Sequence, residues 1–157
     1  MAKALRILKT DKIEDEKSLR TPSSPVTDED FGSKEFKNLL ENLLLTAKKS
    51  EEPAGGIASP QVGVNKRIFY ILDYDTNEWK LFINPEVEPI GFIKSKMEES
   101  CLSVPNREEK VLRYKKIKIK YQDKNGNWHT EKYKDLNAIT IQHEIDHLDG
   151  ILFIDRI

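Results

Sequence analysis

The chain has 157 residues, a length that suits one domain with one core, so we expect residues 1–157 to form a single domain. Basic (26) and acidic (27) side chains nearly cancel to a formal net charge of −1, which indicates no nucleic-acid partner and no attraction to anionic lipid. The absence of a long apolar run excludes a membrane-spanning helix or a secretory signal, and the lone Cys101 excludes an internal disulfide, so a cytoplasmic protein is expected.

The first third of the chain predicts one helix. Residues 9–33 are rich in charge, Ser and Pro, and favour an extended arm or loops. Beyond them, apolar residues recur at three- and four-residue steps, as in an amphipathic helix: Phe36, Leu40, Leu43, Leu44 and Ala47. Ser33 is a suitable N-cap, and the Pro- and Gly-containing residues 53–56 end the helix and open a loop.

The middle of the chain predicts strands joined by hairpins. Residues 67–73 are typical of a buried strand, and residues 79–83 of its partner. Residues 111–121 alternate, with isoleucines on one face and lysines on the other, which predicts one half-buried strand. The lysines could contact phosphate, but we interpret them as the solvated face of an edge strand. Asn125-Gly126 predicts a hairpin turn, with residues 128–133 returning.

A second helix is predicted near the C-terminal end. Asp135 is a candidate cap, Gly150 a candidate terminator, and the apolar positions between them are Leu136, Ile139, Ile145 and Leu148. The order of helix, strands and helix predicts an α+β fold with largely antiparallel sheets packed around a central C-terminal helix, and with an N-terminal amphipathic helix.

This second helix carries the pattern H-E-x-x-H. In a helix, His143 and His147 lie one turn apart on the same face, where two imidazoles can bind one metal ion, and Glu144 lies beside them to handle a proton. A chance match on an exposed helix is the alternative. The helix is apolar on much of its circumference, however, and burying two histidines without partners is costly, which favours a metal site.

A catalytic site of this kind needs a third protein ligand. Cys101, between a predicted strand and a Pro-containing turn, is the first candidate, although a single cysteine is often only a small buried residue. A carboxylate such as Glu99 or Asp146 is the alternative. The loop at residues 54–63 lacks a phosphate-loop motif, but Gln61 at its end carries a side-chain amide that can donate to a developing oxyanion.

Three segments together resemble, in order, the signature motifs of the peptide deformylase family. They are Gly56-Ile57-Ala58-Ser59-Pro60-Gln61, Glu99-Ser100-Cys101-Leu102-Ser103, and Gln142-His143-Glu144-Ile145-Asp146-His147-Leu148-Asp149-Gly150. The likeness runs from about Leu5 to Ile154. Ala54, Ser59 and Ser100 depart from the family pattern, which puts substrate preference and rate in question more than the reaction. The C-terminal helix that many members carry after the third motif is expected to be missing.

The resemblance implies a hydrolase that removes the formyl group from formyl-methionyl peptides. Cys101, His143 and His147 would hold a divalent ion, with Fe(II) favoured and Zn(II), Ni(II) or Co(II) as substitutes. Glu144 would act as general base on the metal-bound water, and the oxyanion would be stabilised by Gln61 and the backbone N–H of Leu102. Substrate contacts are expected from Gly55, Gly56, Ile57, Met97, Glu99, Leu136 and Ile139.

Nascent formylated peptides are the implied partners, with the ribosome as a possible transient one, and a monomer is the simplest expectation. Two alternatives stay open. A zincin-type protease shares H-E-x-x-H but lacks a suitable third ligand downstream of His147. A catalytically degenerate module would bind peptide or metal without turnover, which the presence of all four essential residue types disfavours.

Overall fold

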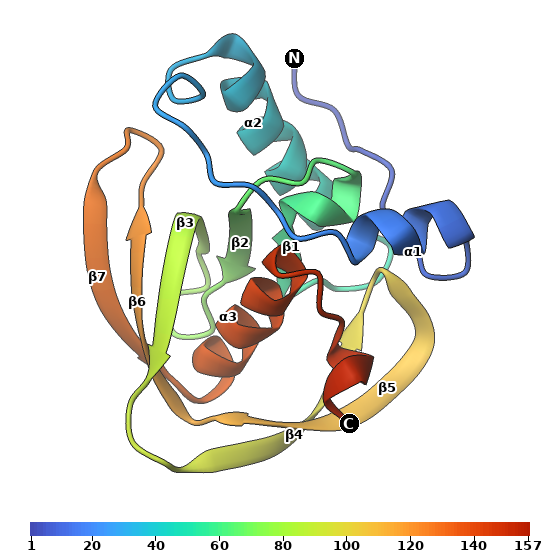
Figure 1. Cartoon of the computed structure of the whole chain (residues 1–157), viewed down its shortest axis with the longest axis vertical. Helices are drawn as coiled ribbons and strands as arrows, with labels where there is room; N and C mark the ends of the chain where they lie inside the picture. The colour runs from blue at the N-terminus through green and yellow to red at the C-terminus, as the bar shows by residue number, and fades with distance from the viewer.

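The computed structural model describes all 157 residues and forms an α+β fold of helices and antiparallel sheets (Figure 1). No helix is both long enough and apolar enough to cross a membrane. The elements in chain order are α1 (Ile13–Leu19), α2 (Lys34–Lys48), β1 (Gly56–Ala58), η1 (Ser59–Val62), β2 (Ile68–Leu72), β3 (Trp79–Pro89), β4 (Lys94–Cys101), β5 (Val104–Tyr114), β6 (Lys116–Gln122), β7 (Trp128–Lys134), α3 (Asp135–Leu148) and η2 (Phe153–Arg156).

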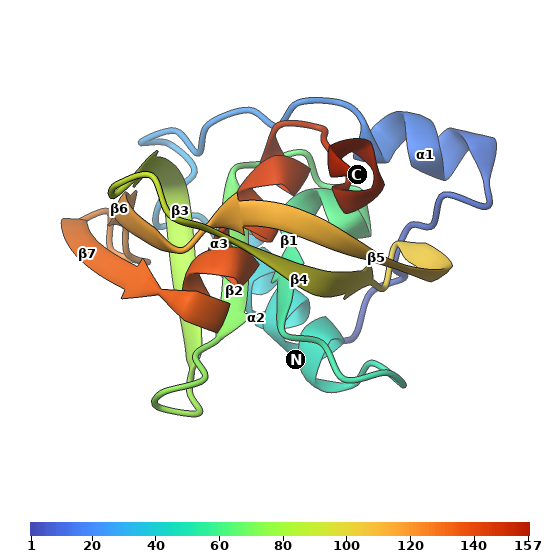
Figure 2. The ribbon, with the colours of Figure 1, turned by 90° about the horizontal axis from the view of Figure 1, so that it is seen from below.

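Five strands form one antiparallel sheet in the order β1-β2-β3-β6-β7, and β4 and β5 form a separate two-stranded ribbon. Seen from below, the ribbon crosses in front of α3 (Figure 2). The antiparallel α+β architecture expected from the sequence is therefore confirmed. The helix α3 lies between the sheet and the ribbon, so residues on its faces meet β1 on one side and β5 on the other.

The large sheet buries side chains on both faces. Along β2, Phe69 and Ile71 pack in the cluster that contains α3 residues, whereas Ile68 and Tyr70 pack against α2. This follows from the alternation of side chains along a strand. A third cluster joins the N-terminal segment to the ribbon and the C-terminal residues: Leu8, Leu19, Val104, Val111, Leu152 and Phe153.

The single strand predicted over residues 111–121 is wrong. Two strands occupy this stretch: β5 pairs with β4 and ends at Tyr114, and β6 pairs with β3 and β7 and begins at Lys116. The break shows in the exposure of Lys115 and Lys116, two consecutive exposed residues that interrupt the alternation. The interpretation of the lysine-bearing strand as an edge is also wrong, because β6 lies between two partners and β7 is the edge.

The prediction of an extended arm before the first helix missed α1. The helix has no apolar stripe, because Ile13 is exposed and only Leu19 is fully buried among its apolar residues. Asp15 fixes it instead: the carboxylate accepts hydrogen bonds from Arg6 (2.7 Å) and from the backbone N–H of Lys9 (3.1 Å). The Arg6 bond, followed by the Lys9 bond, lowers the pKa of Asp15 to about 2.

The ends of α2 and α3 are formed differently. The hydroxyl of Ser33 accepts the Phe36 N–H (3.2 Å) and caps α2. Asp135, expected as the cap of α3, is instead its first residue, and the preceding Lys134 makes no side-chain cap. At the other end Gly150 has a φ of 76°, and a Cβ there would lie 2.4 Å from the Arg20 carbonyl oxygen, so only glycine fits.

Candidate metal centre and active site

The helix α3 presents His143 and His147 one turn apart, with their ring centroids 5.1 Å from each other. Cys101, the last residue of β4, brings its sulfur to 3.3 Å from Nε2 of His147. One ligand atom from each of the three residues lies within 4.8 Å of the others, so the three side chains converge on one point. A thiolate and two imidazoles are a donor set that suits Zn(II) or Fe(II), and the residues therefore fit a metal ion.

The orientation of His143 is set by Glu99. Its Nδ1 lies 2.8 Å from a Glu99 carboxylate oxygen, so Nδ1 carries a proton and Nε2 is the ring nitrogen left available to a metal ion. Glu99 in turn accepts two hydrogen bonds from Arg113, at 2.6 and 3.0 Å. Burial alone would raise the pKa of Glu99, but the hydrogen bonds from His143 and Arg113 outweigh it and hold the pKa below its usual range.

Arg113 also binds Asp146, the other carboxylate considered from the sequence as a third metal ligand. Its guanidinium donates to Asp146 (2.9 Å), and Asp146 further accepts two bonds of 2.8 Å from Arg156. Both candidate carboxylates, Glu99 and Asp146, are thus occupied by arginines, which leaves Cys101 as the third member of the cluster. Sequence reasoning missed Arg113 and Arg156, because no local spacing links them to the motif.

We expect Arg113→Met to destabilise the fold strongly. Arg113 is 4% exposed and neutralises two buried carboxylates, and removal of one partner from a buried ion pair costs about 3–5 kcal/mol. Urea unfolding of the variant measures the loss. Arg107→Met is the matched control, because Arg107 contacts only Glu109 and is substantially exposed; its unfolding midpoint should stay near wild type. Equal midpoints for the two variants would contradict a structural role for the buried network.

Glu144 lies beside the histidines and is 3% exposed, and its Oε1 has no hydrogen-bond partner within the protein. Burial raises the pKa of Glu144 to about 7, which suits a group that takes and returns a proton near neutrality. The carboxylate fits closely against β1: a Cβ on Gly56 would lie 2.6 Å from Glu144 Oε2 and 3.0 Å from the Tyr70 carbonyl oxygen.

Gly56→Ala should therefore displace the Glu144 carboxylate or the adjoining strand. We expect kcat to fall by roughly 10-fold or more, because even a 1 Å misplacement of a catalytic group can cost as much as 100-fold. Formate release under saturating formyl peptide, the reaction that the resemblance of the three motifs implies, measures it. Gly55→Ala is the control, since a Cβ there meets only the end of the Tyr74 side chain, at 3.1 Å. If both variants turn over alike, the close fit around Glu144 does not matter for catalysis.

Gln61 is held in one orientation. Its Oε1 accepts the Ala58 N–H (2.9 Å), so the amide nitrogen must point the other way. That nitrogen donates to the Ser103 hydroxyl (3.1 Å) and lies 3.6 Å from the Cys101 sulfur. The side chain is buried, and it faces the metal centre with an N–H directed toward it.

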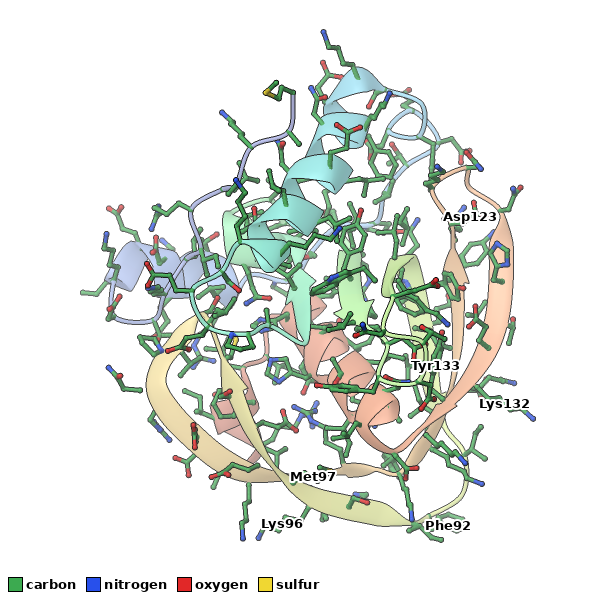
Figure 3. The ribbon with its side chains drawn as sticks, turned by 180° about the vertical axis from the view of Figure 1, so that it is seen from behind. Phe92, Lys96, Met97, Asp123, Lys132 and Tyr133 are labelled. Atoms are coloured by element: carbon green, nitrogen blue, oxygen red, sulfur yellow. The ribbon has the colours of Figure 1, made fainter.

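A pocket of about 240 Å³ opens onto these groups. Of the residues predicted to contact substrate, those that line it are Gly55, Gly56, Met97, Glu99, Leu136 and Ile139, together with the catalytic candidates Gln61, Leu102 and Glu144. Ile57 does not line it, because its side chain is fully buried against α2. Met97 lies on β4 beneath α3 (Figure 3). Tyr74 and Thr140 also line the pocket and were not predicted.

The fold and the site are those of a metal-dependent hydrolase, and comparisons with known proteins define the family. The family model for polypeptide deformylase matches residues 7–157. The chain is 34% identical over 148 residues to a peptide deformylase of Leptospira biflexa, covering 88% of this chain and 82% of that protein. It is 41% identical over 138 residues to the peptide deformylase of Pseudomonas aeruginosa, covering 87% and 79%.

Solved structures agree with the sequence comparison. A class I type b peptide deformylase from Acinetobacter baumannii, crystallised with Met-Ala-Ser bound, superposes with a TM-score of 0.89 at 28% identity and with full coverage of both chains. The chain therefore belongs to the polypeptide deformylase family. Its reaction is the hydrolytic removal of the formyl group from N-formyl-methionyl peptides.

Proposed function

We propose that residues 1–157 form one catalytic domain in which Cys101, His143 and His147 hold a divalent metal ion. The convergence of their ligand atoms within 4.8 Å is the observation that carries this assignment. When bound, such an ion acts as a Lewis acid and lowers the pKa of water toward neutrality. We favour Fe(II) because the family resemblance implies it; Zn(II), Ni(II) or Co(II) are possible substitutes, since a mixed sulfur and nitrogen donor set accepts all of these ions.

In this proposal Glu144 is the general base. Its carboxylate removes a proton from the water that attacks the formyl carbon, and later gives that proton to the amine nitrogen that leaves. The unpartnered Oε1 supports this role, because one carboxylate oxygen is free to accept the proton. The products are formate and a peptide with a free amino terminus.

Two N–H donors of the protein are proposed to stabilise the tetrahedral oxyanion. Gln61 offers its side-chain nitrogen, which the Ala58 bond holds toward the site, and Leu102 offers its backbone N–H beside Cys101. The Ala58 bond fixes the amide before substrate arrives, so the oxyanion has only to replace the Cys101 sulfur, 3.6 Å away, as the acceptor of one Gln61 N–H.

The peptide is proposed to bind as an added strand. β1 pairs only with β2, and β4 pairs only with β5, so each has one unpaired edge, and both strands contribute to the pocket wall. Backbone groups at Gly55, Gly56, Ile57 and Glu99 would pair with the substrate. The methionine side chain would enter the part of the pocket formed by Met97, Leu136 and Ile139.

Formate release from formyl-Met-Ala-Ser, measured with anaerobically added Fe(II), tests the proposal. We expect turnover of the formyl peptide and little turnover of the acetyl peptide, because the reacting carbon must approach the cluster of Cys101, His143 and His147, where an added methyl group would crowd it. Comparable turnover of both would contradict this crowding. Metal binding without formate release would indicate a degenerate binding module, and cleavage inside the peptide would indicate a protease. Metal analysis of anaerobically purified protein tests the preference for Fe(II).

Nascent formylated peptides are the proposed partners of the site, with the ribosome as a transient one. A cytoplasmic monomer fits the lone cysteine and the heavily charged sequence. Sedimentation of the purified protein, alone and mixed with ribosomes, distinguishes a free monomer from a ribosome-associated one.

A further inference from the structure

Positively charged side chains gather on the outer face of β6 and β7. Alternate residues of the two strands are buried against α3, among them Ile117, Ile119 and Tyr133, so the residues between them face outward. The outward residues are Lys116, Lys118, Lys120 and Gln122 on β6, and Trp128, Thr130, Lys132 and Lys134 on β7. This set, the β6–β7 outer face, has five lysines and no carboxylate of its own, while the neighbouring strand β3 places Glu86 opposite Lys120 and Glu88 opposite Lys118.

The lysines oppose one another across the ladder. Lys116 pairs in register with Lys134, and Lys118 with Lys132. Like charges directly opposite on antiparallel strands are destabilising. Within the protein only Lys118 is neutralised, by Glu88 of β3 at 3.3 Å. Cross-strand pairing with Glu86 and Glu88 of β3 explains Lys120 and Lys118, which leaves Lys116, Lys132 and Lys134 as the lysines with no carboxylate in register.

An exposed aromatic ring completes this face. Trp128 is 50% exposed, and the Lys120 ammonium lies 4.8 Å from the centroid of its ring. Beside it, a hollow of about 340 Å³ is lined by Lys118, Lys120 and Thr130 and, from β3, by Glu86, Val87 and Glu88, so two carboxylates lie next to two of the lysines. Lysines that can contact phosphates, next to an accessible aromatic ring on which a base can stack, are the two elements by which sheets bind single-stranded nucleic acid.

We propose that the β6–β7 outer face binds single-stranded RNA, with lysines on the phosphates and one base stacked on Trp128. The choice of RNA over DNA rests on the family's reaction, because newly made peptides are produced where RNA is the abundant polyanion. No residue that lines the active-site pocket comes from β6 or β7, so RNA bound here leaves the pocket open to substrate. The formal net charge of −1 gives no sign of this face, because it sums the charges of the whole chain.

Fluorescence anisotropy with a labelled 12-nucleotide U-rich RNA tests this, with the full chain titrated at 50 and 200 mM KCl. Wild type should bind, and more weakly at higher salt. Lys132→Gln with Lys134→Gln should weaken binding by roughly 10-fold or more and reduce the salt slope by about 1.4, because each phosphate contact on a single strand contributes about 0.7. Trp128→Ala should weaken binding by roughly 10-fold with the salt slope unchanged.

The matched control carries the same change of charge elsewhere. Lys12 and Lys17 are exposed beside and within α1, on the side of the molecule opposite to β7 (Figure 1). Lys12→Gln with Lys17→Gln should leave RNA binding within about twofold of wild type. Unchanged circular dichroism and unchanged formate release from a short formyl peptide show that each variant is folded.

Several results would overturn the proposal. They are no RNA binding by wild type at 50 mM KCl, an equal loss in the α1 control, and tighter binding to DNA of the same sequence. Binding to phosphatidylglycerol vesicles without binding to RNA would assign the face to a membrane surface instead. Phe92, which is 96% exposed near this face, would then be the residue to test for insertion (Figure 3).

Discussion

Glu144→Gln should reduce kcat for formate release by about 10² to 10⁴-fold, the usual contribution of general acid–base catalysis. Glutamine keeps the shape and the close contact with Gly56, but it cannot accept a proton from the attacking water or return one to the leaving amine. KM should change little, because in the proposed mechanism the carboxylate acts on the water and not on the peptide backbone. Metal content should stay at wild-type level, since Glu144 is not part of the cluster of Cys101, His143 and His147.

Steady-state formate release together with metal analysis separates the possible roles of Glu144. A variant that loses metal as well as activity would show that Glu144 shapes the metal centre. A variant with near-normal kcat would show that another group is the base.

Cys101→Ala should remove most of the bound metal and reduce formate release to near the background rate. The variant keeps two histidines of the cluster, and two imidazoles alone leave the centre one protein ligand short of the three that catalytic zinc-type sites use. Metal per chain after dialysis measures the first effect and formate release the second. The Cys101 thiol also lies 3.6 Å from the Gln61 amide nitrogen, so its loss removes a contact of the proposed oxyanion donor as well.

Ser100→Gly is the neighbouring control for Cys101→Ala. The Ser100 side chain is exposed, and glycine is the residue that the family pattern has at this position. It should keep its metal and its activity. Retention of metal by Cys101→Ala would show that another residue completes the set, and the assignment of the thiol would then be wrong.

The sequence predicted much of the candidate site because its groups lie in short motifs. His143 and His147 are one helical turn apart, so their spacing alone places them on one face. Cys101 could be proposed as the third member, but only the fold shows its sulfur 3.3 Å from the His147 ring. The family likeness to known deformylases is confirmed by the match over residues 7–157.

The sequence could not predict the parts that depend on distant contacts. Arg113 is separated by 14 residues from Glu99 and by 33 from Asp146, so no period or local spacing relates the three. The short helix α1 is likewise fixed by Asp15 and Arg6 and by the burial of Leu19, not by an apolar stripe. Local patterns report which face of an element is apolar, whereas ion pairs between elements appear only after the chain has folded.

Contacts between the β4–β5 ribbon and α3 couple metal binding to the stability of the folded protein. Cys101 ends β4, Arg113 lies near the end of β5, and both reach partners on the same helix. An ion held by Cys101 and the histidines would act as a cross-link between segments more than 40 residues apart in the chain. Because a ligand that binds only the native state stabilises it, loaded protein should resist heat and proteases better than chelated protein. In chelated protein, cleavage by proteases should begin in the β4–β5 ribbon.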